Sequence, residues 1–137
     1  MKAVLSLIIV MILNVSICCA QTANQIEKQI DKLDAVHQEC LDEGVNMPNC
    51  ATIFYSQMDS ILNVVYKRLK KQMDTAEFKE LKRSQVAWLK KRDSQFKEFD
   101  LEAQQNELGV DVGTTLAFNK KSFVVIERVK YLLKSLK

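Results

Sequence analysis

No glycine or proline occurs between residues 49 and 108, so this part of the chain lacks the residues that most often interrupt a helix. Apolar residues recur in it at steps of three and four, the spacing of one face of an α-helix. Asp74 is followed three residues later by Glu77, a pattern typical of a capping box at a helix start. The sequence therefore predicts two helices, over residues 50–73 and 75–106, with a turn between them near Asp74.

A further helix is expected on the N-terminal side of this pair. Residues 24–43 carry apolar side chains spaced alternately four and three positions apart, as in an amphipathic helix. Gly44 is expected to end that helix, because glycine commonly follows the last helical turn. A loop over residues 45–49 then leads to Asn49, which we expect to be the N-cap of the next helix.

The C-terminal part of the chain predicts a fourth helix. Gly109 and Gly113 mark a loop over residues 108–115, and helical spacing resumes over residues 114–136. No strand pattern competes with these helices, so the predicted fold is all-α, a small bundle of about four helices built on antiparallel helical hairpins. The residues of the last helix expected to face the core are Phe123, Ile126, Val129, Leu133 and Leu136.

Residues 1–20 are typical of a secretory signal peptide. A positive start is followed by an almost entirely apolar run over residues 3–17, and small residues precede an expected cleavage between Ala20 and Gln21. The apolar run is short for a membrane span, which needs roughly 20 residues. We therefore expect the mature protein to be a single helical domain over residues 21–137, exported to the periplasm or secreted.

Lipid attachment is the alternative to simple cleavage. A lipoprotein processing site would make Cys19 the first residue of the mature protein, although Cys18 stands where a small residue normally precedes such a site. Only with a lipid on Cys19 do we expect the protein to be attached to a membrane.

Two cysteines remain after the signal is removed, Cys40 and Cys50. In an oxidising compartment this pair predicts one disulfide, which would clamp the corner between the first two helices of the mature chain. No Cys-x-x-Cys motif follows the signal, and the single histidine, His37, falls at a seam position of its helix. We expect His37 to pack against the core, and we expect no metal and no cofactor.

The charge of the mature chain is close to balanced but unevenly placed. Without Lys2 it has 19 basic and 17 acidic residues, a net charge of +2, which argues against a nucleic-acid partner. Residues 21–60 carry a net charge of −5 and residues 61–92 a net charge of +7. The basic run over residues 67–71 is interpreted as a solvated helix face, and the alternative is contact with anionic lipid or a polyanionic cell-wall polymer.

Two polar and aromatic rows face one another if the two central helices form a tight hairpin. The expected contacts are an ion pair between Asp59 and Arg92, stacking of Arg92 on Trp88, and a hydrogen bond from Asn63 to Gln85 or Tyr66. Such a network would fix the register of the helices. The alternative is a recognition patch, because Trp, Tyr and Arg are common interface hot spots.

Catalytic patterns are missing from the sequence. No Ser/His/Asp set, no glycine-rich phosphate loop and no acid and base pair in contrasting surroundings can be identified. The protein is therefore expected not to be an enzyme.

The spacing of the cysteines and of the two polar rows resembles the LprI-like lysozyme-inhibitor family, a group of small exported bacterial helical proteins. The resemblance covers residues 37–93 and consists of the two cysteines, D-x-x-L-N-x-x-Y and Q-x-x-W-x-x-x-R. Family members often have a further cysteine pair and a Thr-x-x-Arg helix near the C-terminus; here the cysteines are absent, and Val125 precedes Arg128 at the threonine position. The matching residues are Cys40, Cys50, Asp59, Leu62, Asn63, Tyr66, Gln85, Trp88 and Arg92.

The resemblance implies inhibition of lysozyme and protection of peptidoglycan outside the cytoplasmic membrane. It does not imply which residues inhibit, so the motif residues are either scaffold or recognition surface. A cationic lysozyme would be attracted by the acidic residues 21–60 and repelled by the basic residues 61–92. The alternative function is a non-enzymatic envelope module that binds another exported protein and has no effect on lysozyme.

Overall fold

The computed structural model describes residues 22–136 as four helices, α2 (Ala23–Asp42), α3 (Met47–Gln72), α4 (Thr75–Gln104) and α5 (Val110–Leu133). No strand occurs in this range, and the predicted all-α fold is confirmed. The predicted signal peptide and the lipid site at Cys19 lie outside the described residues. None of these four helices is both long enough and apolar enough to span a bilayer.

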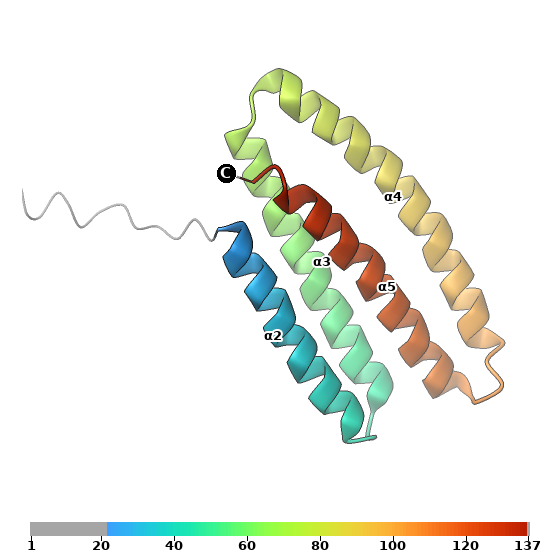
Figure 1. The fold of residues 1–137 in the computed structure, drawn as a ribbon. Helices are drawn as coiled ribbons and strands as arrows, with labels where there is room; N and C mark the ends of the chain where they lie inside the picture. Colours follow the sequence, from blue (N-terminus) through green and yellow to red (C-terminus); the bar gives the residue numbers. More distant parts are fainter. Residues whose placement is uncertain (1–21, 137) are drawn as a thin grey trace, which may run out of the picture.

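The last helix lies in the middle of the bundle. Figure 1 shows α5 between α3 and α4, and α2 beside α3. The main contacts between helices are accordingly those of α3 with α5, α4 with α5, and α2 with α3. The predicted turn between α3 and α4 is present, but beyond it each helix packs mainly against α5, and α3 and α4 meet through ring contacts of Tyr55 with Phe96 and of Tyr66 with Phe78. The expectation of a tight hairpin in which α3 faces α4 directly was therefore wrong.

The turn between α3 and α4 is fixed by the predicted capping box. Asp74 Oδ1 accepts hydrogen bonds from the backbone N–H groups of Ala76 and Glu77, both at 2.9 Å. In return, Glu77 Oε2 accepts the backbone N–H of Asp74 at 3.2 Å. These bonds satisfy donors that the first turn of α4 cannot pair within the helix, so α4 begins at this point in the sequence.

Two helix starts differ from the predictions. The N-cap of α3 is Asn46, not Asn49, because Pro48 fits the first helical turn, where its missing N–H costs nothing. Asn46 has a φ of 54°, a left-handed conformation that asparagine tolerates better than most residues. Helix α5 likewise starts at Val110, four residues before the predicted start, directly after Gly109 with its φ of 101°.

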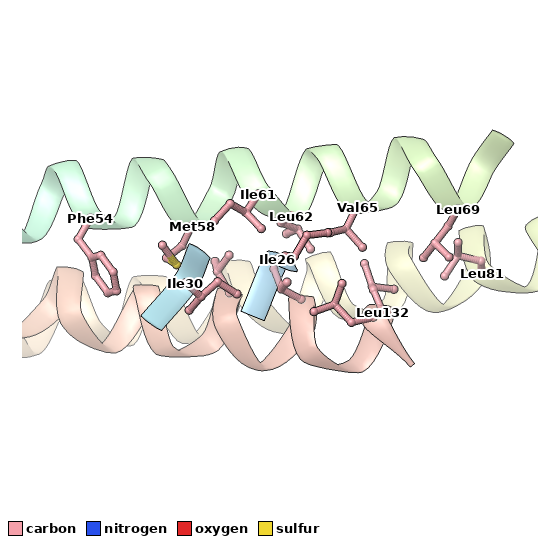
Figure 2. Packing of buried hydrophobic residues seen from close by; sticks show 13 residues of the cluster. Ile26, Ile30, Phe54, Met58, Ile61, Leu62, Val65, Leu69, Leu81 and Leu132 are labelled. Atoms are coloured by element: carbon pink, nitrogen blue, oxygen red, sulfur yellow. The ribbon is translucent and has the colours of Figure 1, made fainter. Parts of the chain in front are cut away.

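The core is one cluster shared by all four helices. Figure 2 shows side chains of α3 meeting those of α5, with Ile26 and Ile30 of α2 packed against them. Val129 and Leu133 are buried as predicted, but Phe123 is 64% exposed, so its expected place in the core was wrong. Helix α5 has two packed sides because it contacts both α3 and α4. Its inward residues therefore do not follow a single stripe.

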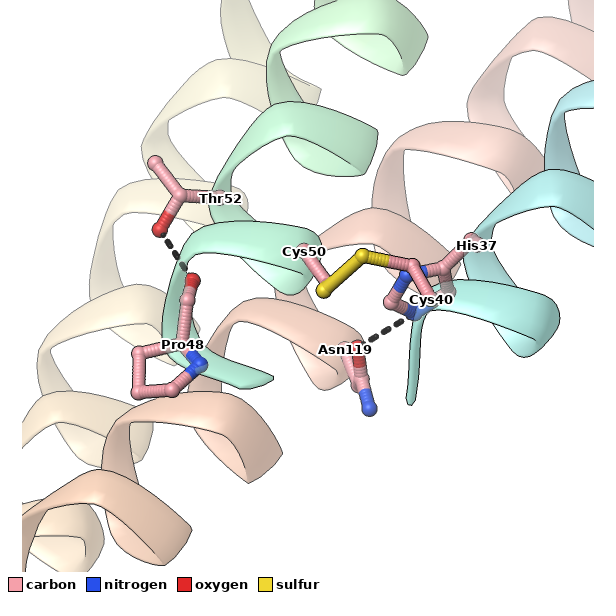
Figure 3. The surroundings of a disulfide bond; sticks show 6 residues. All are labelled: His37, Cys40, Pro48, Cys50, Thr52 and Asn119. Atoms are coloured by element: carbon pink, nitrogen blue, oxygen red, sulfur yellow. Dashed lines mark hydrogen bonds between the residues drawn. A yellow bond between two sulfur atoms is a disulfide. The ribbon is translucent and has the colours of Figure 1, made fainter. Parts of the chain in front are cut away.

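The predicted disulfide joins Cys40 near the end of α2 to Cys50 in α3, with 5.9 Å between the Cα atoms. His37 is buried one helical turn before Cys40 and stacks on Phe54, with 4.5 Å between ring centroids. Its Nε2 is hydrogen-bonded with Asn119 Oδ1 of α5 at 2.9 Å, as Figure 3 shows. The end of α2 is thus attached to α3 by a covalent bond and to α5 by a polar contact.

Removal of the disulfide is expected to lower the free energy of unfolding. A Cys40→Ser/Cys50→Ser variant should lose roughly 2 to 3 kcal/mol, because the bond limits the conformations of the unfolded chain. Urea denaturation followed by circular dichroism measures this loss. The wild-type protein with its disulfide reduced serves as the control and should match the variant. Equal stability of the oxidised and reduced proteins would contradict the prediction.

Candidate functional site

Six of the seven residues that match D-x-x-L-N-x-x-Y and Q-x-x-W-x-x-x-R line one groove between α3 and α4, and Trp88 is the exception. This motif groove has a volume of about 290 Å³. The structure thus brings the two rows to one site even though the helices do not pack tightly against each other. Its lining residues are Asp59, Leu62, Asn63, Tyr66, Lys82, Gln85, Val86, Leu89 and Arg92.

The polar contacts within the motif groove differ from those predicted. Asn63 Nδ2 donates to the backbone oxygen of Asp59 at 2.9 Å and to its Oδ2 at 3.2 Å, within the same helix. Arg92 forms its ion pair with Asp93 at 2.7 Å. The predicted bonds between Asp59 and Arg92 and from Asn63 to Gln85 or Tyr66 were therefore wrong. Those bonds required α3 and α4 to pack more closely than they do, because both helices make their closest contacts with α5.

The predicted stacking of Arg92 is confirmed. Its guanidinium lies 5.4 Å from the ring centroid of Trp88 and 5.5 Å from that of Phe96. Burial raises the pKa of the nearby Tyr55 hydroxyl above its ordinary value; the charge of Asp59 raises it further, and the charge of Arg92 lowers it. The charges of Asp59 in α3 and Arg92 in α4 thus both act on the half-buried Tyr55, although these two residues form no ion pair with each other.

Arg128 of α5 lies behind the motif groove and joins it to the rest of the bundle. It is only 7% exposed. Its Nε donates to Gln85 Oε1 at 2.9 Å, and a terminal nitrogen donates to Ser84 Oγ at 3.0 Å. The guanidinium also lies 5.6 Å from the ring centroid of Trp88 and 4.8 Å from that of Tyr131. The motif residues Gln85 and Trp88 therefore serve to attach α4 to α5.

Burial lowers the pKa of the Arg128 guanidinium, and Tyr131 acts on it in the opposite direction. An arginine nevertheless stays charged in a protein at neutral pH, so α5 places a positive charge directly behind the groove. In the sequence, Arg128 stands out only as a partial match to the Thr-x-x-Arg pattern. That match was the one available signal, because spacing alone gives no reason to expect a charged residue to be buried.

A second buried cation, Lys121, was not predicted. It is 8% exposed and forms an ion pair with Asp100 of α4. Its amino group also lies 4.8 Å from the ring centroid of Phe118 and 5.4 Å from that of Phe96. Like Arg128, Lys121 joins α5 to α4. The contact between these two helices therefore has one buried cation of α5 toward each end.

Charge is separated along the length of the bundle. The antiparallel helices bring the end of α2, the start of α3, the end of α4 and the start of α5 together, away from the Asp74 turn (Figure 1). This acidic end, residues 38–53 and 97–121, has eight acidic and three basic residues, a net charge of −5. The basic end, residues 22–28, 66–83 and 127–136, has eleven basic and five acidic residues, a net charge of +6. The imbalance seen along the sequence thus becomes a dipole along the molecule.

Metal ligands do not gather in the part of the chain that the structure describes, where no group of three or more His, Cys, Asp or Glu side chains is placed to hold an ion. His37 Nε2 is already hydrogen-bonded with Asn119, and Cys40 and Cys50 are bonded to each other. The arrangement offers a groove and two charged ends, which are features suited to binding.

Comparison with known proteins gives one match. A family model described as lysozyme inhibitor LprI matches residues 38–125, more than half of the chain. No curated protein and no solved structure matches the chain. The matched range extends further toward the C-terminus than the resemblance read from the motifs and includes most of α5, but it stops before Arg128.

Proposed function

Because the chain belongs to the LprI lysozyme-inhibitor family, we propose that it is an exported protein that binds a lysozyme and inhibits it, and so protects peptidoglycan. The observation that carries this proposal is the family match over residues 38–125. The protein would act by occupying a surface of the lysozyme and would itself catalyse no reaction.

The distribution of charge on the bundle supports the acidic end as the surface that contacts the lysozyme. Glu39, Asp42 and Glu43 of the α2 end are exposed and form no ion pair with other residues in the 22–136 range. Glu107 and Asp111 add two more exposed carboxylates at the same end. A cationic lysozyme would be drawn toward these carboxylates and oriented by the dipole, since complementary charge speeds association and selects the contacting face. We therefore place the lysozyme contact at the acidic end.

The proposal predicts inhibition that depends on salt. Excess mature protein should suppress the hydrolysis of peptidoglycan by a cationic lysozyme at low ionic strength, and the association rate should fall about tenfold or more in high salt. A Glu39→Gln/Asp42→Asn/Glu43→Gln variant should have a slower association rate at low salt. Residual lysozyme activity and stopped-flow binding measure the two effects.

A matched control changes the same number of charges at the other end of the bundle. The variant Glu27→Gln/Glu80→Gln/Glu127→Gln removes three exposed carboxylates from the basic end and should associate as fast as the wild type or faster. Equal slowing in both variants would contradict the acidic end as the contact. If the folded protein left lysozymes of several classes fully active, the inhibitor proposal itself would fail.

That last outcome would favour the alternative function, a non-enzymatic envelope module that binds another exported protein. The motif groove supports this alternative, because it combines Arg92, Tyr66 and the exposed Val86 on one surface. Arginine and tyrosine are among the residues that most often dominate binding energy at protein interfaces.

A further inference from the structure

The basic end carries exposed lysines in α3, in α4 and at the C-cap of α5: Lys67, Lys70, Lys71, Lys79, Lys82 and Lys134. None of these lysines forms an ion pair with another residue between 22 and 136, and this end keeps a net charge of +6 despite its five acidic residues. Helices α3 and α4 meet at the Asp74 turn and α5 ends beside them (Figure 1). The lysines therefore concentrate positive charge at one end of the bundle.

The N-terminal segment of the chain joins the bundle at this end. Helix α2 runs antiparallel to α3 and begins at Ala23, close to the last turns of α3 and α5 (Figure 1). In the sequence, only five residues separate Ala23 from the apolar run at residues 3–17. Five residues span at most about 18 Å. While the signal peptide is still attached, the membrane that receives the apolar run therefore lies within about 18 Å of the start of α2, at the basic end of the bundle.

We propose that the basic end is a docking surface for a bilayer containing anionic lipid, and that the acidic end points away from that bilayer. Lysine ammonium groups within a Debye length of such a surface, about 8 Å at physiological ionic strength, are attracted to its phosphate groups. The dipole sets the orientation, because the same surface repels the carboxylates at the opposite end. Lipid binding does not depend on lysozyme inhibition, but its consequence does: an inhibitor docked in this way presents the acidic end to an approaching cationic lysozyme.

Vesicle binding tests the proposal with the mature protein. Sedimentation with vesicles of 40% phosphatidylglycerol and 60% phosphatidylcholine in low salt gives the partition coefficient, and pure phosphatidylcholine vesicles are the reference. The wild type should bind the anionic vesicles and not the neutral ones. Each lysine removed from the contact should weaken binding about fivefold. The variant Lys67→Gln/Lys71→Gln/Lys79→Gln should therefore bind at least 30-fold more weakly.

The chain provides a control with the same change of charge away from the basic end. The variant Lys90→Gln/Lys91→Gln/Lys97→Gln alters exposed lysines in the later turns of α4 and should bind no more than about threefold more weakly. Circular dichroism establishes that both variants are folded. Equal losses in the two variants, or equal binding of the wild type to neutral vesicles, would overturn the proposal.

A competition experiment distinguishes binding to a lipid surface from binding to an anionic cell-wall polymer. A soluble anionic polymer, polyglycerol phosphate, is added at constant ionic strength. If the protein binds the bilayer, the anionic vesicles should still retain most of it at equal phosphate concentration. Transfer of the protein to the polymer would overturn the assignment to lipid. Inhibition of a soluble lysozyme is measured without vesicles, so a failure of either proposal is recognised separately.

Discussion

Replacing Arg128 with alanine is expected to lower the free energy of unfolding by about 3 to 4 kcal/mol. The substitution leaves the buried Gln85 Oε1 without its hydrogen-bond partner and opens a cavity beside the rings of Trp88 and Tyr131. Hydrogen bonds to charged groups contribute more than neutral ones, and an unpaired buried acceptor carries its full desolvation cost. Urea denaturation followed by the fluorescence of Trp88 measures the loss and reports on the ring that Arg128 contacts.

Arg92→Ala is the control for this substitution. Arg92 also stacks on Trp88, but its ion pair is with the exposed Asp93, and such surface pairs contribute less than about 1 kcal/mol. Arg128→Lys should recover only part of the lost stability, since lysine lacks the planar fork that reaches Gln85 and Ser84 together. If Arg92→Ala and Arg128→Ala had equal effects, Arg128 would not be the residue that attaches α4 to α5.

Gly113→Ala is expected to destabilise the protein by about 3 kcal/mol, although alanine normally favours a helix. A Cβ at residue 113 of α5 would overlap the backbone carbonyl oxygen of Ala103 in α4 and lie 3.0 Å from its carbonyl carbon. A backbone carbonyl cannot rotate away as a side chain can, so α4 and α5 would have to separate at this end. At a solvent-facing position the same change would add about 1 kcal/mol of stability.

Thermal unfolding of Gly113→Ala beside Thr114→Ala decides this prediction. Thr114 is the next residue of α5 and is half-buried, so its replacement should change stability by only about a few tenths of a kcal/mol. A rise in the stability of Gly113→Ala would show that the approach of α5 to Ala103 is not close. The sign of the effect therefore tests the α4–α5 contact directly.

Features that depend on residues close in sequence were predicted correctly. The capping box at Asp74 depends on the three positions that follow it, and the disulfide closes a separation of only ten residues. The helical spacing of apolar residues likewise reflects local geometry, so all four helices and most of their boundaries followed from it. Asn46 was missed because its left-handed cap makes no side-chain hydrogen bond of the kind that a capping pattern predicts.

The arrangement of the helices was not predictable in the same way. The predicted pairing of Asp59 with Arg92 assumed that helices adjacent in sequence pack side by side, whereas α5 packs against both α3 and α4. The pattern of α5 concealed this role, because the buried Lys121 and Arg128 have the character of surface residues and the exposed Phe123 that of a core residue. Because of these three side chains, the sequence did not indicate that α5 is the central helix. The prediction that the two motif rows lie close together nevertheless agrees with the lining of the motif groove.

The central position of α5 also sets the order in which native contacts become available as the chain emerges. The hairpin of α2 and α3 needs only residues 23–72, and its disulfide closes a short loop, so this part can be oxidised early. Helices α3 and α4 both pack against α5, and this common contact cannot form until residues 110–133 have been synthesised. The core therefore closes last, around the final helix, and a chain that stops before α5 keeps its corner disulfide but leaves the apolar faces of α3 and α4 uncovered.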